Sequence, residues 1–230
     1  DASGRFHDLP DEEKMALKAN EHNVGYMGPG SSVSRASQVY EGERKANLVA
    51  AFFLKRDLPP DHTDIVENKP FRGANQWPAN LDGFRETTVA YMNAMEALAK
   101  SMLPIYAAAL DLPADFFSKA FEEPQYTLRL SHYPPAEAED NQFGLAPHTD
   151  SSFLTLLAQN EVEGLQVRAG DGTWINAPVL PNTFLVNTGD MLRRWSNHRF
   201  LSTPHRAIAS APNKDRYAIP FFFDAHADYV

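Results

Sequence analysis

The spacing of apolar residues divides the chain into a helical first part and a strand-rich second part. Over residues 81–110, apolar side chains recur mostly every three or four positions, which predicts one long helix that contains Pro104. From residue 125 onward the period shortens, and β-rich segments alternate with turn-forming residues. These segments are YTLRLSHY, SFLTLLAQ, GLQVRA, TWINA, TFLVNTG, HRAIAS and RYAIPFFF.

The other predicted helices are short. Residues 9–18 are expected to form a helix that Asp11 caps, because acidic residues fill its first turn. Residues 113–121 predict a second one, with Pro113 at a favourable first-turn position. Residues 20–80, by contrast, are rich in Gly, Pro, Asn and Ser, which is the composition of loops.

Seven or eight short strands after a helical section indicate an α+β protein. A double-stranded β-helix, or jelly-roll barrel, is the natural closure for so many strands, and the long helix is expected to pack on its outside. The length suits one large domain, with residues 1–124 as its helical and loop region and residues 125–230 as its jelly-roll core. Because the chain lacks a starting Met and ends within FFFDAHADYV, both ends of the domain are expected to be truncated.

Composition narrows the class of ligand. The net charge of −9 argues against a general nucleic-acid or anionic-membrane binder, but it allows a small anionic ligand held by one or two arginines. The absence of cysteine excludes disulfides, cysteine-zinc sites and a thiol nucleophile, and it is compatible with a reducing compartment. No apolar run approaches the length of a membrane span. We therefore expect a cytoplasmic protein that acts on a small molecule, not on nucleic acid or membrane, and whose oligomeric state is open.

Three His-x-Asp motifs raise the question of a metal site. His62 and Asp64 lie in a Pro-rich loop, where Thr63 or Asp61 is expected to cap a short helix without any metal. The pair at 226–228 follows the last predicted strand and would need partners from upstream. Neither motif is therefore favoured as a metal site.

The third motif has a better context. His148 and Asp150 lie at the mouth of the strand SFLTLLAQ, and side chains two apart on an extended backbone point the same way. His205, 55 residues after Asp150, opens another strand and can supply a third ligand. Two His and one carboxylate suit a non-haem Fe(II) oxygenase, but catalytic zinc sites use the same ligands, so the ligands alone leave the metal open.

Arg216 adds a second kind of group to this arrangement. It lies eleven residues after His205, on the following strand. Arginine binds carboxylates through paired, charge-assisted hydrogen bonds. Such a cation beside an open iron site suits a 2-oxo acid, which would chelate the iron at one end and meet Arg216 at the other.

A His-x-Asp pair, a distant His and then Arg-x-Ser or Arg-x-Ala resemble the signature of the isopenicillin N synthase-like family of 2-oxoglutarate and Fe(II)-dependent oxygenases. The likeness extends over residues 125–224, and the stretch FRGANQWP with the long helix resembles the family's N-terminal region. The segments that carry it, in the family's order, are YTLRLSHYPP, GLAPHTDSSFLTLL, GLQV, FLVNTGDMLRRWSN, FLSTPHRA and RYAIPFFF.

The resemblance implies a jelly-roll enzyme that oxidises, most often hydroxylates, a small organic substrate with O2 and releases succinate and CO2. It implies Fe(II) bound by His148, Asp150 and His205. It further implies 2-oxoglutarate held by Arg216 with help from Tyr133, and Ser131 near this co-substrate. The substrate pocket is expected to contain Phe222, parts of the loop 24–40 and Arg56.

One position departs from the family pattern. The family usually has Ser two residues after the arginine, where this chain has Ala218. A hydroxyl hydrogen bond to a charged carboxylate contributes roughly 1.5–3 kcal/mol, so its loss corresponds to about tenfold weaker 2-oxoglutarate binding or more. Three alternatives therefore stay open: an iron enzyme of the same fold that uses no 2-oxoglutarate, a zinc cupin-like enzyme and a metal-free binding barrel.

Overall fold

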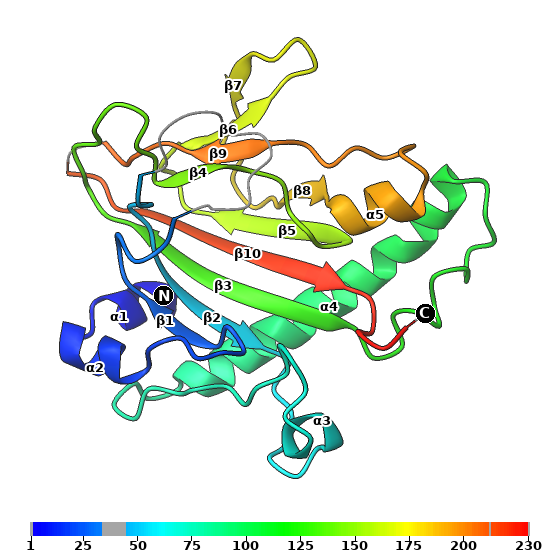
Figure 1. The fold of residues 1–230 in the computed structure, drawn as a ribbon, viewed down its shortest axis with the longest axis horizontal. Coiled ribbons are helices and arrows are strands. Elements are labelled where there is room, and N and C mark those ends of the chain that lie inside the picture. Colours follow the sequence, from blue (N-terminus) through cyan, green and yellow to red (C-terminus); the bar gives the residue numbers. More distant parts are fainter. Residues whose placement is uncertain (1, 34–44, 212, 230) are drawn as a thin grey trace.

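The computed structural model describes residues 2–33, 45–211 and 213–229. Its centre is a jelly-roll barrel of two antiparallel sheets that face each other (Figure 1). The major sheet has the order β1-β2-β3-β10-β5-β8 and the minor sheet the order β4-β9-β6-β7. Successive strands from β3 to β10 thus alternate between the two sheets, except where β6 and β7 form a hairpin. The strands are β1 (Gly25–Met27), β2 (Ala50–Lys55), β3 (Gln125–Tyr133), β4 (Leu145–His148), β5 (Leu154–Gln159), β6 (Leu165–Arg168), β7 (Trp174–Asn176), β8 (Leu185–Thr188), β9 (His205–Ala207) and β10 (Arg216–Asp224).

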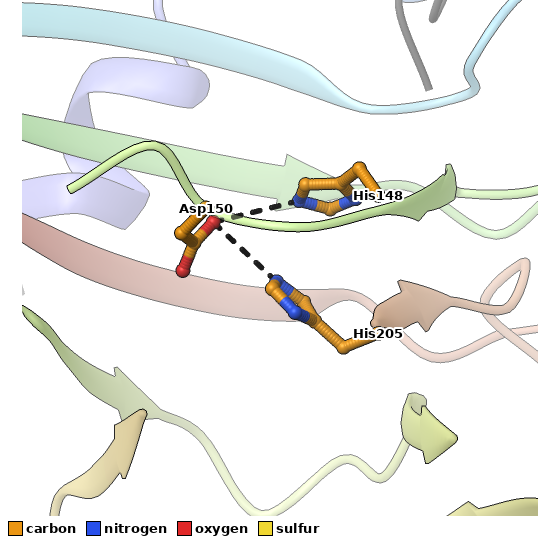
Figure 2. Close-up of side chains that lie close together, drawn as sticks. All are labelled: His148, Asp150 and His205. Carbon is orange, nitrogen blue, oxygen red and sulfur yellow. Dashed lines mark ion pairs between the residues drawn. The ribbon is translucent and has the colours of Figure 1, made fainter. Parts of the chain in front are cut away.

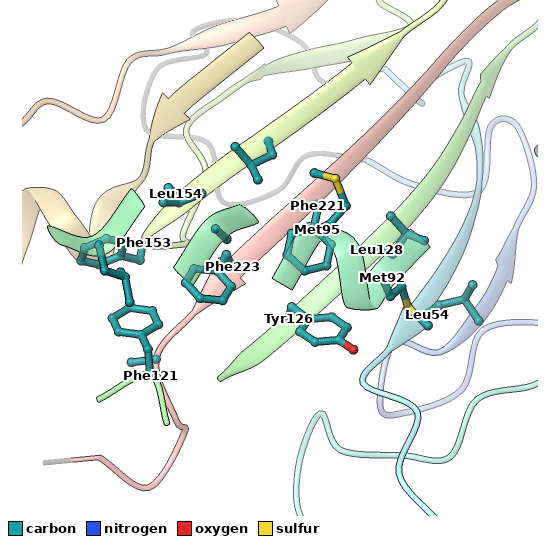
Figure 3. Close-up of a cluster of buried hydrophobic side chains, with 14 of the residues drawn as sticks. Leu54, Met92, Met95, Phe121, Tyr126, Leu128, Phe153, Leu154, Phe221 and Phe223 are labelled. Carbon is teal, nitrogen blue, oxygen red and sulfur yellow. The ribbon is translucent and has the colours of Figure 1, made fainter. Parts of the chain in front are cut away.

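The long helix α4 (Phe84–Ala109) runs along the outer face of the major sheet and continues through Pro104, as expected (Figure 1). Its buried residues, Met92 and Met95 among them, pack against outward-facing side chains of β3 and β10 such as Leu128 and Phe221 (Figure 3). Among the described residues, no helix is both long and apolar enough to cross a membrane. The other helices are α1 (Ala2–His7), α2 (Asp11–Ala16), α3 (Thr63–Val66) and α5 (Asp190–Trp195).

Strand alternation gives the major sheet two chemically different faces. On β10, Phe221 and Phe223 point outward to the helix and are fully buried, whereas Arg216, Ala218 and Phe222 line a cavity between the sheets. Neighbouring strands follow the same rule because side chains at alternate positions share a face. The outer face therefore holds the fold together, and the inner face is available for polar chemistry.

The N-terminal part is more regular than its loop composition predicts. Strands β1 and β2 extend the major sheet by pairing with β3, so residues 20–80 are not all loop. Helix α1 was not expected, and α2 has Pro10 rather than Asp11 as its N-cap. Asp11 is instead the first helical residue, where its charge favours the positive end of the helix dipole.

Residues 113–121 form successive turns instead of the predicted helix. Several backbone bonds there close over three residues, as from Phe116 to Pro113 and from Ser118 to Asp115, which is the tighter 3₁₀-type spacing. The apolar residues of this segment pack individually, because the rings of Phe117 and Phe121 both contact Phe153. Tertiary contacts thus override the local helical signal.

Phe153 connects the turns at 113–121 with helices α4 and α5, since its ring also contacts Tyr106 and Trp195. The side chain is fully buried. We expect Phe153→Ala to lower the free energy of unfolding by about 3–5 kcal/mol, because it removes buried area and leaves a cavity. Urea unfolding measures the change. Ile105→Ala, on the exposed side of α4 (64% exposed), is the control and is expected to stay within about 0.5 kcal/mol. Equal losses in both variants would contradict this account of the core.

Candidate metal centre and co-substrate pocket

Strand pairing in the minor sheet brings two histidines together. His148 is the last residue of β4, a strand that the sequence pattern did not predict, and His205 is the first residue of β9. The two are direct partners in the β4–β9 register, and their ring centroids lie 4.4 Å apart. Asp150 follows β4 and turns its carboxylate to both rings (Figure 2). Its Oδ1 atom lies 3.8 Å from Nε2 of His148 and 3.5 Å from Nε2 of His205.

Hydrogen bonds on the far side of each ring determine which nitrogen faces the centre. Nδ1 of His148 lies 2.8 Å from the Ala146 carbonyl oxygen, and Nδ1 of His205 lies 3.0 Å from that of Thr203. A carbonyl oxygen only accepts, so each Nδ1 carries the proton and donates it. The Nε2 atoms are therefore left with lone pairs that converge on one point, which is the arrangement of metal-ligating histidines.

The carboxylate of Asp150 is oriented in the same way. Its Oδ2 atom accepts hydrogen bonds from Thr155 Oγ1 at 2.7 Å and from Asn187 Nδ2 at 2.8 Å. Oδ1 is thereby directed to the histidines. Burial by itself raises the pKa of Asp150, but the His205 imidazole outweighs it and holds this pKa well below its usual range. Burial, aided by His205, lowers the pKa of His148 to about 4. At neutral pH the centre thus offers an ionised carboxylate and an unprotonated His148.

These three residues fit a divalent metal ion. Their ligand atoms all lie within 4.8 Å of one another, and within the described part of the chain no other group of three His, Asp or Glu side chains meets this condition. Two imidazoles and one carboxylate on one side of an ion leave its other positions open for small molecules.

The two other His-x-Asp motifs have structural roles. His62 is itself the N-cap of α3, where Thr63 or Asp61 was expected, and its Nδ1 accepts from the backbone N–H of Asp64. His226 Nδ1 accepts from Asp228 N in the same way. Both aspartates then form ion pairs with the buried Arg72, at 2.9 Å from Asp64 and 3.3 Å from Asp228.

Arg216 is fully buried at the narrow end of the cavity that contains the metal centre. Its guanidinium lies 4.7 Å from the centroid of the Tyr133 ring, and Nη2 donates to Gln159 at 3.2 Å. Nε and Nη1 have no hydrogen-bond partner. Gly164 makes room for this side chain, because a Cβ there would lie 2.9 Å from Arg216 Cδ. A buried cation with two unpaired donors is costly unless an anion occupies the space beside it.

Ala218 and Ser131 are paired across β10 and β3, close to Arg216. Ala218 lines the cavity. Ser131 lies two residues from Tyr133 on the same face of β3, and its buried Oγ has no hydrogen-bond partner. The strand opposite Ala218 therefore supplies a free hydroxyl at the position where the family's serine is missing.

The predicted substrate-pocket residues divide between two sites. Phe222 lines the cavity beside the metal centre, and Met27 represents the loop 24–40 there, of which residues 34–40 lie outside the described part of the chain. Arg56 does not belong to this cavity: it faces a separate surface pocket and lies 3.9 Å from Glu96 of α4. Its neighbour Lys55 faces the metal cavity, because adjacent strand residues point to opposite faces.

Sequence reasoning missed Thr155, Asn187 and Arg129. Each is an inward-facing polar residue in an otherwise apolar strand, and each lines the cavity. A polar residue at every second position of a predicted strand is the signal that could have found them.

A jelly roll with this ligand set and a buried arginine beside it defines the class of Fe(II)- and 2-oxoglutarate-dependent oxygenases. Comparison with known families agrees. Residues 124–225 match the 2OG-Fe(II) oxygenase superfamily, and residues 1–80 match the N-terminal region of non-haem dioxygenases in morphine synthesis. The chain belongs to this superfamily.

Its relatives carry corresponding names. The chain is 35% identical over its whole length to the 2-oxoglutarate-Fe(II) type oxidoreductase hxnY of Emericella nidulans, of which it spans 66%. It is 34% identical over 99% of its length to the 2-oxoglutarate-dependent dioxygenase citB of Monascus ruber, spanning 70% of that protein. Neurospora crassa T7H, solved with alpha-KG and thymine, superposes with a TM-score of 0.82 at 27% identity, covering 99% of this chain and 71% of T7H.

The hydrogen bonds to Asp150 give a test of the metal centre that leaves all three ligands in place. We expect Asn187→Leu to weaken Fe(II) binding roughly 10–100-fold, because the carboxylate loses one of the two donors that orient it. Anaerobic Fe(II) titration followed by calorimetry measures the affinity. Asn176→Leu, which removes a hydrogen bond with Gln166 in the β6–β7 hairpin, is the matched control. Unchanged affinity in Asn187→Leu would contradict the proposed role of this side chain.

Choice among the three motifs is tested separately. His205→Ala should abolish specific Fe(II) binding, whereas His62→Ala should leave it intact, since His62 only caps α3. The reverse result would refute the assignment of His148, Asp150 and His205.

Proposed function

We propose that the protein is a non-haem oxygenase that uses Fe(II) and 2-oxoglutarate to oxidise, most directly to hydroxylate, a small organic substrate with O2, releasing succinate and CO2. The observation that carries this proposal is the pairing of the His148–Asp150–His205 centre with the buried, partly unpaired guanidinium of Arg216 in one cavity. Fe(II), when bound, supplies the activation of O2.

Each side chain then has a defined task. His148, Asp150 and His205 would hold the metal, with Asp150 kept ionised by its surroundings. Arg216 would bind the far carboxylate of 2-oxoglutarate through Nε and Nη1, the two donors that lack a partner. Tyr133 covers the guanidinium face and keeps water from it. Phe222 borders both ends of the cavity and would contact the substrate.

Alternatives without 2-oxoglutarate account for less of the site. A zinc enzyme or an iron enzyme without this co-substrate explains the three metal ligands but leaves Nε and Nη1 of Arg216 unpaired and buried. A metal-free barrel explains neither feature. The unpaired arginine therefore favours a 2-oxo acid.

We further propose that residues 1–124 and 125–230 act as one domain, because β1 and β2 of the first part extend the major sheet of the second. A cytoplasmic location is also proposed, supported by the complete absence of cysteine.

Loss of Arg216 should affect the co-substrate more than the metal. We expect Arg216→Ala to raise the 2-oxoglutarate concentration needed for half-maximal succinate release by more than tenfold, because charge-assisted hydrogen bonds contribute roughly 1.5–3 kcal/mol. Fe(II) affinity should stay unchanged. Arg85→Ala, an exposed arginine on α4 remote from the cavity, is the control. If Arg216→Ala changes nothing, the co-substrate assignment is wrong even with an intact metal centre.

The pair of Ser131 and Ala218 gives a compensation test. We expect Ser131→Ala to weaken 2-oxoglutarate binding about tenfold, and Ala218→Ser to restore most of it in the double variant, because either strand can supply the hydroxyl. Binding is measured through the visible band of the anaerobic Fe(II) complex on titration with 2-oxoglutarate. Losses in Ser131→Ala that Ala218→Ser does not relieve would contradict the exchange of hydroxyls.

A further inference from the structure

The inner face of the major sheet carries a second shielded guanidinium, which the proposed mechanism does not use. Arg129 lies in the middle of β3 and lines both ends of the metal cavity, together with His148 and Asp150. Its guanidinium carbon lies 5.4 Å from the centroid of the Phe53 ring on the neighbouring strand. Phe53 and Arg129 are direct cross-strand partners, so the stacking follows from the register of β2 and β3.

Arg129 has no polar partner within the described part of the chain. Its Nε atom is buried without a hydrogen bond, and the side chain forms no ion pair there. Arg216, by comparison, has at least Gln159. Burial lowers the pKa of Arg129, and only Tyr133 and Asp150 act in the opposite direction. Because Asp150 is committed to the metal, the cation of Arg129 has an unmet need for an anion.

The two arginines serve different parts of the cavity. Arg216 stacks on Tyr133, which lies four residues beyond Arg129 on β3. Four residues of extended strand correspond to about 13 Å. Arg129 instead faces the wide end of the cavity, which Arg216 does not line and where there is room for a molecule larger than 2-oxoglutarate.

Charge at the wide end supports an anionic occupant. The chain as a whole carries a net charge of −9, yet the cationic side chains lining this end outnumber the acidic ones that are not metal ligands. An inversion of sign in a cleft concentrates ligands of the opposite charge. The cations are Lys55, Arg129, Arg168, Arg193 and Arg194, and the acids are Asp190 and Asp224.

The walls around Arg129 also restrict the body of this occupant. Phe53, Phe222 and Leu145 line the same end, so the surface beside the cation is apolar. The planar fork of arginine matches a carboxylate through two parallel hydrogen bonds. An organic acid with an apolar body satisfies both features.

We propose that the prime substrate is a small carboxylic acid, that Arg129 binds its carboxylate, and that this contact holds the apolar body between Phe53 and Phe222 beside the metal. This inference rests on the proposed function, since it names the substrate class of the same site. Arg129 is thus a residue that determines specificity, separate from the arginine that binds the co-substrate.

The test uses the anaerobic complex of the full chain with Fe(II) and 2-oxoglutarate. The probes are aromatic and aliphatic monocarboxylic acids, each paired with its own primary amide, so that shape stays constant while charge changes. Calorimetry gives the affinity of each probe, and the visible band of the complex reports whether the probe reaches the metal. The variants are Arg129→Gln, Arg129→Lys and the remote control Arg85→Gln.

In the wild type and in Arg85→Gln we expect the best acids to bind at least about tenfold more tightly than their amides. Arg129→Gln should abolish this preference while its affinity for 2-oxoglutarate stays the same. Arg129→Lys keeps the charge without the fork and should bind the acids with intermediate affinity. If the glutamine variant does not fold, the lysine variant carries the test, since its acid affinity must fall while its amide affinity does not.

Three results would overturn the proposal: no acid binds the wild type, the preference for acids survives in Arg129→Gln, or loss of Arg129 weakens 2-oxoglutarate binding instead. Failure of the proposed function gives a different result. In that case the wild type shows no 2-oxoglutarate-dependent band at all, before any acid is added.

Discussion

The pairing of β4 with β9 is the interaction on which the site depends. It sets His148 directly opposite His205, so the two imidazoles are neighbours before any metal arrives. Asp150 follows two residues after β4 and needs only one turn of backbone to meet them. The same antiparallel pairing closes the minor sheet over the major one, which carries Arg216, Arg129 and Thr155 on its inner face. A single register thus determines both the metal centre and the walls around it.

The three His-x-Asp motifs show how little a motif determines without its surroundings. In the two structural motifs, Nδ1 of the histidine accepts the N–H of its own aspartate, and the aspartate turns away to Arg72. At the metal centre, Nδ1 of His148 donates to a carbonyl two residues earlier. The ring is therefore presented by its other nitrogen. A change of hydrogen-bond direction at one atom separates a helix cap from a metal ligand.

Much of the fold could be predicted because its signals are local. The long apolar period predicted α4, and seven β-rich segments predicted the strands of the barrel other than β4. The choice of His148, Asp150 and His205 followed from strand context and from the distant Arg216. The helix expected over 113–121 failed because Phe117 and Phe121 are held by Phe153, a residue far away in sequence. Arg56 was chosen in place of Lys55 because composition does not reveal which of two adjacent residues faces inward. Thr155 and Asn187 were missed for a related reason, since their roles depend on cross-strand neighbours.

The alternation along β10 has a consequence for folding itself. If this strand paired one residue out of register, Arg216 would enter the apolar layer beneath α4, and Phe221 and Phe223 would enter the polar cavity. A charged group in an apolar layer costs several kcal/mol, so such a state would be strongly disfavoured. The residues that give the cavity its chemistry therefore also protect the barrel from misassembly. An apolar replacement of Arg216 would remove a co-substrate ligand and, at the same time, one of the features that keep β10 in its correct alignment.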